Sequence, residues 1–332
     1  MEFLDGVRAQ PGYLERSRGL VQAALRGIDT AALRRGTTLA VGIGASGHAA
    51  AGFAARLRAR GATAYPFSPG DGPPGHADSY VAITYSGRST ETVRLMESLG
   101  ATGTRIAVTG HPDAPIAGVV DRIVGLGGAT DTAVSTLSYT ATVQALGLLA
   151  DAAWGEDAEV WRALPGHAAA VLDDRTTADR IASAFAGVAC VDVVGSGMGA
   201  GSAGAAALLL REAAHLPAAA YGLREYLHGP LEVAGPGRGA LVFGAGRAAR
   251  LAAEMAGWGS PTVLVTADPS VPGTPGGPVV VRLPALPEAA GAVLDLLPVQ
   301  LAAAELAARR GLPIALRHMP ADTKLPAVRD AG

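Results

Sequence analysis

Short apolar strands alternate with helical stretches along the first half of the chain. The strands are β-branched and end in glycine or hydroxyl residues, whereas the helical stretches are rich in alanine and leucine and mostly stop at a glycine. We predict strands within residues 37–46, 62–67, 79–87, 104–111 and 121–128, and helices over 47–61, 89–100 and 133–154. Strands that alternate with helices indicate a parallel sheet covered on both faces.

The second half of the chain repeats this order. We predict strands within residues 188–201, 238–246, 261–268 and 277–284, and helices over 202–216, 249–259 and 291–311. The last helix should be kinked or interrupted near Pro298, because proline removes a helical hydrogen bond. The predicted fold is therefore α/β, with two units that each form a flavodoxin-like, three-layer α/β/α sandwich.

The same pattern predicts the domain divisions. They are an N-terminal helical segment over 1–28, a first α/β domain over 29–152, a helical connector over 153–180, a second α/β domain over 181–310, and a C-terminal tail over 311–332.

Composition narrows the classes of function. Of the 332 residues, 49% are apolar and 17% charged, which is typical of a compact protein, and the net charge of −2 leaves no basic surplus for nucleic acid. The apolar runs fall short of the roughly 20 residues that span a membrane. Cys190 is the single cysteine, which excludes a disulfide framework and a zinc cysteine cluster. The charged N-terminus is unlike a secretory signal, so we expect a cytoplasmic protein without a metal.

Two glycine-rich turns raise the question of a dinucleotide cofactor. Residues 42–47 read GIGASG, and GSGMGAG begins at Gly195. Such a fingerprint needs an acidic residue about 20 positions later to bind the ribose. The strand that follows the first turn ends without an acid, and Glu212 after the second falls inside a predicted helix. We therefore expect no NAD site and no cofactor. Ordinary α/β glycine turns are the alternative explanation of the two stretches.

A third turn, ITYSGRSTET at residues 83–92, carries an unusual number of hydroxyls. They are Thr84, Ser86, Ser89, Thr90 and Thr92. Hydroxyls and free backbone N–H groups at a helix N-terminus bind anions, and a phosphate monoester accepts several hydrogen bonds. Ser46 follows a neighbouring strand and could complete the site. An ordinary helix cap is the alternative, although one serine would suffice for it.

Several motifs together resemble the sugar isomerase (SIS) superfamily. SGRSTET is similar to its phosphosugar-binding motif, and AVSTLSYTATV to a later segment in which Leu137 replaces the usual lysine. The other matching stretches are FLDGVRAQP, REYLHGPLE and LDLLPVQLAAAELAARRG. They occur in the order found in the isomerase domain of glucosamine-6-phosphate synthase and its relatives.

The resemblance implies roles for individual residues. The positions that match phosphate-binding or sugar-facing positions of the family are Ser46, Thr84, Tyr85, Ser86, Ser89 and Ser135. Glu212 lies at the spacing of the proton-transfer glutamate, and a carboxylate suits proton movement between C2 and C1. His228 matches the ring-opening histidine, which relatives contribute across a homodimer interface, and histidine titrates near neutral pH.

The tail contains the only lysine of the chain. The composition counts 27 Lys and Arg, so the other 26 basic residues are arginine, and Lys324 stands in the loosely matching stretch HMPADTKLP. Lysine can lose its proton and form a Schiff base, whereas arginine stays charged. We expect a chemical role for Lys324; a solvated tail residue is the alternative.

The resemblance implies an enzyme that acts on a phosphorylated sugar or amino sugar. We rank isomerisation coupled to loss of ammonia, as in glucosamine-6-phosphate deaminases, ahead of a simple aldose–ketose isomerase or a fructosamine-type deglycase. Residue 2 is Glu rather than the catalytic cysteine of a glutaminase, so glutamine-dependent amination is not expected. A non-catalytic phosphosugar sensor is the rival from a different class.

Overall fold

The chain folds into two compact units. The structure is a computed structural model, and it describes residues 1–72, 74–156 and 159–326. The β1–β5 unit comprises Gly12–Thr130, Leu137–Arg162 and the described residues from Arg317 onward, and the β6–β10 unit comprises Met1–Pro11, Asp131–Thr136 and Ala163–Leu316. Two of the divisions fall within helices, α1 (Phe3–Leu25) and α5 (Val160–Asp173).

The β1–β5 unit is built on a parallel sheet of five strands among its described residues. The strands are β1 (Thr37–Val41), β2 (Thr63–Phe67), β3 (Ser79–Ile83), β4 (Thr104–Thr109) and β5 (Arg122–Gly125). Their order, β2-β1-β3-β4-β5, is that of flavodoxin-like folds. Its other elements are α2 (Ala45–Ala59), α3 (Thr90–Ser98), α4 (Leu137–Ala153), η1 (Thr30–Arg34), η2 (Pro115–Val119) and η4 (Ala321–Thr323).

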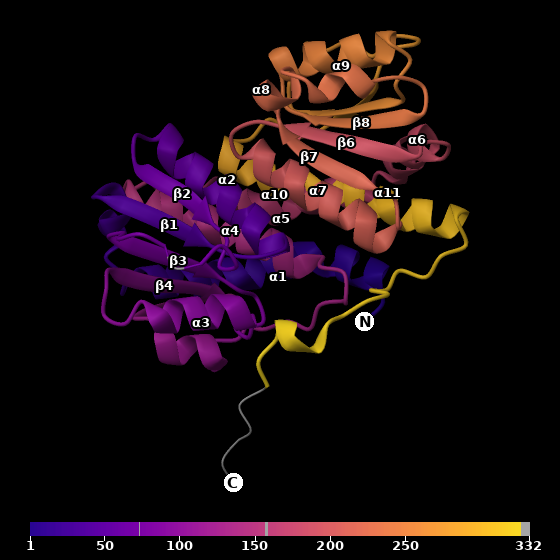
Figure 1. Ribbon diagram of the computed structural model, residues 1–332. Coiled ribbons are helices and arrows are strands. Elements are labelled where there is room, and N and C mark those ends of the chain that lie inside the picture. Colours follow the sequence, from indigo (N-terminus) through magenta and orange to yellow (C-terminus); the bar gives the residue numbers. More distant parts are fainter. Residues whose placement is uncertain (73, 157–158, 327–332) are drawn as a thin grey trace. The chain divides into compact units, whose positions relative to one another are not determined.

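Alternation along the strands explains why helices cover both faces of this sheet (Figure 1). Leu39 and Val41 pack with Val93 and Met96 of α3, whereas Ala40 between them is also fully buried and points to the other face. Because both faces are buried, the strands read as continuous apolar runs.

The β6–β10 unit repeats the topology among its described residues. Its strands are β6 (Cys190–Gly195), β7 (Ala218–Gly222), β8 (Arg238–Phe243), β9 (Thr262–Thr266) and β10 (Val279–Arg282), in the order β10-β9-β8-β6-β7. Its other elements are α6 (Arg175–Phe185), α7 (Gly199–Ala213), α8 (Leu223–Tyr226), η3 (Pro230–Val233), α9 (Arg247–Gly257), α10 (Glu288–Leu294) and α11 (Leu296–Arg309). The prediction of two parallel α/β units is thus confirmed.

The structure departs from the prediction at the start of α4 and at β7. The helix expected from residue 133 begins at Leu137, because the Asp131 carboxylate accepts hydrogen bonds from the backbone and side chain of Thr136 and holds 131–136 in a turn. β7 was not predicted, since its alanine-rich sequence has little strand preference. The interruption predicted near Pro298 is present: the final helix breaks at Asp295, where the ring of Pro298 would clash with the carbonyl of Leu294.

The last apolar helices also pass a simple test for membrane spans. Among the described residues, Glu288–Arg309 has the length and mean hydropathy to cross a bilayer, and 78% of its apolar 18-residue stretch is buried inside the protein. Leu297, Val299 and Leu306 within it are fully buried or nearly so.

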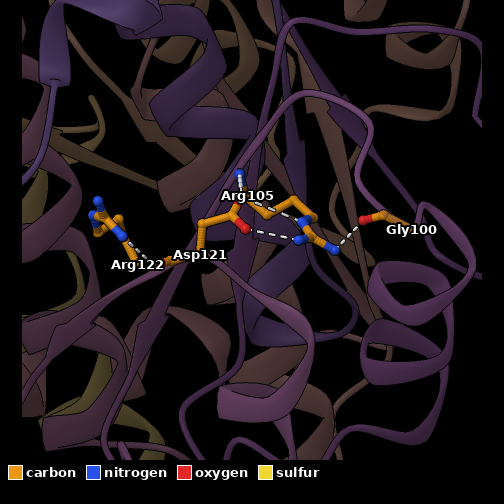
Figure 2. Close-up of polar contacts among 4 residues, drawn as sticks. All are labelled: Gly100, Arg105, Asp121 and Arg122. Atoms are coloured by element: carbon orange, nitrogen blue, oxygen red, sulfur yellow. Dashed lines mark hydrogen bonds and ion pairs between the residues drawn. The ribbon is translucent and has the colours of Figure 1, made fainter.

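An ion pair fastens the starts of two neighbouring strands in the β1–β5 unit. The guanidinium of Arg105 donates to Asp121 at 2.7 Å and also to the carbonyl of Gly100, and Arg122 donates to the carbonyl of Asp121 (Figure 2). The hydrogen bond from Arg105 lowers the pKa of Asp121. This contact lies where β4 and β5 begin, at the amino ends of the strands.

Candidate functional site

The carboxyl ends of β1 and β3 form the topological switch point of the β1–β5 unit. The two strands are parallel neighbours, with Val41 opposite Ala82, so the turns that follow them leave the same edge of the sheet. β2 lies on the far side of β1, and the chain reverses direction across the sheet here. Ligands of open α/β sheets bind in such crevices.

A tight turn presents the hydroxyls predicted to bind an anion. We call residues 84–90 the hydroxyl loop. The hydroxyls of Thr84 and Ser89 lie 3.1 Å apart, and the N–H of Gly87 donates to the carbonyl of Thr84. Gly87 has φ +64°, and a Cβ there would lie 2.4 Å from the Cβ of Ala114. Only glycine therefore fits at this position.

The hydroxyl loop ends at the start of α3. Among the described residues, the Ser89 side chain makes no capping hydrogen bond to α3, and its hydroxyl contacts Thr84 instead. Ser86 and Ser89 are half-buried, whereas Thr84 is buried. The first N–H groups of a helix are suited to an anion, and two accessible hydroxyls stand beside them here.

The hydroxyls of Thr90 and Thr92 are used differently from those of the loop. The Thr90 hydroxyl donates to the carbonyl of Asp322 at 2.7 Å. Thr92 is fully buried, and its hydroxyl has no hydrogen-bond partner among the described residues. Of the five hydroxyls in this stretch, Ser86 and Ser89 are therefore the accessible ones.

The C-terminal tail is hydrogen-bonded along the hydroxyl loop. Lys324 pairs with Ser89 as an antiparallel bridge, and the N–H of Leu325 donates to the carbonyl of Arg88 at 2.8 Å. In return Nε of Arg88 donates to the carbonyl of Leu325 at 2.6 Å. Leu325 also packs against the apolar core beneath α3. The yellow tail in Figure 1 follows this path past α3.

These contacts determine the position of Lys324, the only lysine of the chain. The tail is joined to the loop by backbone and side-chain bonds, so the backbone of Lys324 is fixed beside Ser89 while its side chain stays exposed. The contacts of Arg88 and Thr90 with the tail were not predicted: Thr90 was counted among the hydroxyls that could bind an anion, and Arg88 was given no role.

Tyr85 contacts other parts of the same unit. Its hydroxyl donates to the carbonyl of Ala129 at 2.6 Å and lies 2.9 Å from the hydroxyl of Tyr13. Its ring meets the ring of His111 edge-on, and Gly110 lies so close that a Cβ there would be 2.8 Å from the Tyr85 ring. Tyr85 therefore joins the hydroxyl loop to the chain around Gly110 and Ala129.

Ser46 lies at the same edge of the sheet, in the first turn of α2. It is half-buried, and Gly42 packs so closely against it that a Cβ on Gly42 would lie 2.6 Å from the carbonyl oxygen of Ser46. The turn after β1 therefore depends on glycine for its shape. This accounts for Gly42 in the GIGASG stretch.

A cavity of about 550 Å³ opens beside the hydroxyl loop. Its wall includes Ser86, Arg88, Gly110, His111, Asp113 and Gly128. The N–H of Ile116 donates to the carbonyl of Gly87, which ties the far wall to the loop. A volume of this size is typical of small-molecule sites. Among the described residues, no three His, Cys, Asp or Glu side chains come together as a metal site.

Three of the predicted site residues belong to the other unit. Ser135 lies half-buried in the 131–136 turn, Glu212 near the end of α7, and His228 just after α8. Burial raises the pKa of Glu212, and the neighbouring charge of Arg211 opposes this shift. The structure thus brings Thr84, Ser86, Ser89 and Lys324 together within one unit, with Ser46 at the same sheet edge.

The corresponding edge of the β6–β10 unit already holds carboxylates. The N–H of Met198, at the start of α7, donates to Glu288 at 3.1 Å, and the hydroxyl of Ser202 donates to Asp295 at 2.6 Å. Both carboxyl groups line a cavity of about 240 Å³. An incoming phosphate would meet like charge there.

Solved structures resemble the whole chain. The C-terminal domain of glucosamine-fructose-6-phosphate aminotransferase from Francisella tularensis matches with a TM-score of 0.82 at 17% identity, over 95% of this chain and 97% of that one. Glucosamine-6-phosphate deaminase from Thermotoga maritima matches with a TM-score of 0.78 at 18% identity, over 96% and 98%. Tagatose-6-phosphate ketose/aldose isomerase from Escherichia coli matches with 0.76 at 20%, over 97% and 94%.

Sequence comparison adds no closer relative. No family model and no curated protein sequence matches the chain. Identities of this size show a shared fold and leave the reaction open. The chain therefore has the two-unit fold of the sugar isomerase (SIS) phosphosugar isomerases.

Proposed function

We propose that this protein is a phosphosugar-processing enzyme that couples aldose–ketose isomerisation to loss of ammonia from an amino sugar phosphate. One observation carries the proposal: the only lysine of the chain is fixed beside a hydroxyl-bearing turn at the start of a helix. The turn suits a phosphate group. The lysine is suited to the carbonyl chemistry of an opened sugar.

The remaining site residues take the roles that the reaction requires. Ser46, Thr84, Ser86 and Ser89 bind the phosphate, while Tyr85 braces their loop and Ser135 faces the sugar. His228 moves the proton that opens the ring. Glu212 then takes a proton from C2 and returns it to C1, and its raised pKa suits a group that must both accept and donate near neutral pH.

The nitrogen leaves by hydrolysis. Proton transfer from C2 to C1 of the open amino sugar leaves an imine at C2. Water adds to that carbon, the C–N bond breaks, and ammonia departs as the ketone forms. Lys324 stands beside the phosphate turn, where its amine can form a Schiff base with a ketose or stabilise charge as it develops.

The exposure of His228 supports a homodimer. His228 is exposed in the β6–β10 unit, so its imidazole is available to a neighbouring subunit. We propose that it completes the site of a second copy. Mixing a His228→Gln variant with a Lys324→Met variant should then restore part of the activity, because each hybrid dimer holds one intact site.

Release of ammonia tests the reaction directly. Purified protein is incubated with glucosamine 6-phosphate, and ammonia and fructose 6-phosphate are measured together. Equal amounts of the two products are expected. Formation of a ketose phosphate from another aldose phosphate, with no ammonia from any amino sugar, would establish the plain isomerase instead; the likeness to the Escherichia coli ketose/aldose isomerase favours this second candidate.

Binding without turnover would identify a sensor. Wild type and Glu212→Gln are compared for binding of glucosamine 6-phosphate by calorimetry and for turnover. An enzyme should bind in both forms and turn over only in the wild type. Binding in both forms with turnover in neither would contradict the proposal.

A further inference from the structure

One buried carboxylate holds both ends of the segment that carries His228. Tyr226 precedes His228 by two positions, and its hydroxyl donates to Oδ2 of Asp192 at 2.9 Å. Arg238, which begins β8, closes the segment and donates through Nε and Nη2 to the two oxygens of Asp192, each at 2.7 Å. Asp192 therefore binds the residues directly before and directly after the segment 227–237.

The attachment point lies in the core of the β6–β10 unit. Asp192 is 1% exposed in the middle of β6, and Tyr226 is fully buried among the apolar residues that pack against α9. The Tyr226 ring packs against the ring of Tyr221 at 5.2 Å between centroids. Buried, charge-assisted bonds of this kind are short and hold their geometry, so the two ends of the segment are fixed.

The middle of the segment is more open. His228 is exposed, and its backbone N–H donates to the carbonyl of Glu225 at 3.0 Å. Gly229 has φ +143°, and η3 follows without a buried residue. Leu227 and Leu231 are partly buried against the same core, and Ser260 bonds Gly235. The position of the imidazole depends on these contacts together with the points where Tyr226 and Arg238 fix the chain.

We propose that Asp192 is a positioning residue for His228, acting through Tyr226 and Arg238. Its catalytic meaning rests on the proposed role of His228 in ring opening. The anchor itself is a property of the fold and can be measured without a substrate. None of the motifs that resemble the SIS family includes Asp192, so the resemblance does not single it out.

Tyr226→Phe tests the anchor with little disturbance, because it removes one hydroxyl and keeps the buried ring. The imidazole Cε1–H signal of His228 is followed by NMR and assigned with His228→Gln. Amide exchange of residues 227–233 is measured in parallel. We expect a broadened or shifted His228 signal and exchange that is about tenfold faster across the segment.

Tyr80→Phe is the matched control. Tyr80 is also buried, at 1% exposure, and its hydroxyl bonds the N–H of Ala77 and the carbonyl of Gly75 in the other unit. It should lower the melting temperature by a similar amount and leave the His228 signal unchanged. Equal His228 signals and equal exchange in wild type and Tyr226→Phe would overturn the anchor.

Turnover separates a positioning role from a structural one. We expect kcat of Tyr226→Phe to fall about tenfold with KM within about twofold, because the phosphate site is in the other unit and a misplaced group loses rate rather than binding. Asp192→Asn should lose more, since it weakens the bonds to both ends. Unchanged kcat despite faster exchange would overturn positioning.

Absence of turnover in the wild type would bear on the proposed function alone. The NMR and exchange measurements would still support or overturn the anchor. If Asp192→Asn fails to fold, Arg238→Lys is the second variant, because it keeps the charge and loses the two-pronged contact.

Discussion

Lys324 is the residue on which the proposed chemistry depends most. Its backbone pairs with Ser89, and no other lysine is available to replace it. Lys324→Arg keeps the positive charge and removes the amine that can lose its proton. We expect turnover to fall at least about 100-fold, while affinity for inorganic phosphate stays within about threefold.

A second tail variant controls for general disturbance. Met319→Leu changes an exposed side chain of the same tail and should leave turnover unchanged. Steady-state rates and phosphate affinity are measured for both variants. A Lys324→Arg enzyme with normal turnover would show that the site needs only a cation there.

Burial raises the pKa of Glu212 on α7. Glu212→Gln keeps the shape of the side chain and cannot move a proton. We expect kcat to fall about 10²–10⁴-fold with substrate affinity little changed. Glu305→Gln on α11 is the control, since Glu305 pairs with Arg309 on the surface. A loss confined to affinity would place Glu212 in binding instead.

The shape of the hydroxyl loop, taken as one element, depends on the backbone turn at Gly87. Gly87→Ala puts a methyl group 2.4 Å from the Cβ of Ala114 at a φ of +64°, so the loop must shift. We expect about 1–3 kcal/mol less stability and at least tenfold weaker phosphate binding. Chemical denaturation and calorimetry measure the two effects.

Gly118 offers a matched comparison in the same unit. A Cβ on Gly118 meets nothing within 4 Å and its φ is not positive, so Gly118→Ala should change neither property by much. If Gly87→Ala behaves like Gly118→Ala, the shape of the loop is not what binds the anion.

At the scale of the whole molecule, Asp295 makes stability depend on pH. Burial raises its pKa to about 6, against the opposing hydrogen bond from Ser202. The folded protein therefore holds this proton after the unfolded chain has lost it. The free energy of unfolding should fall by about 2–3 kcal/mol between about pH 4 and pH 6, and Asp295→Asn should remove that fall.

Asp174 provides the opposite sign. Hydrogen bonds from Thr176 and Thr177 lower its pKa, so its contribution to stability is present above the unfolded pKa and is lost as the pH falls. Denaturation curves at several pH values give the slope of the free energy of unfolding against pH. Asp174→Asn and Asp295→Asn should change this slope in opposite directions. Equal slopes for both variants would contradict the assignment to Asp295.

Local pattern was sufficient for the architecture and for the position of the hydroxyl loop. The strands of both sheets are apolar runs that end in glycine or hydroxyl residues, and this signal is contained within a few neighbouring positions. It failed at β7, where alanines carry no strand preference, and at the start of α4, where Asp131 holds a turn that propensity does not reveal.

What the sequence alone determined was therefore the two-unit α/β fold and the hydroxyl loop, because hydrophobic period and turn chemistry are local. Tertiary structure decided which partners meet across long stretches of chain. It placed Lys324 beside Ser89 and bound Tyr226 and Arg238 to Asp192. Such contacts join residues tens to hundreds of positions apart, and only the packing of the folded core selects them.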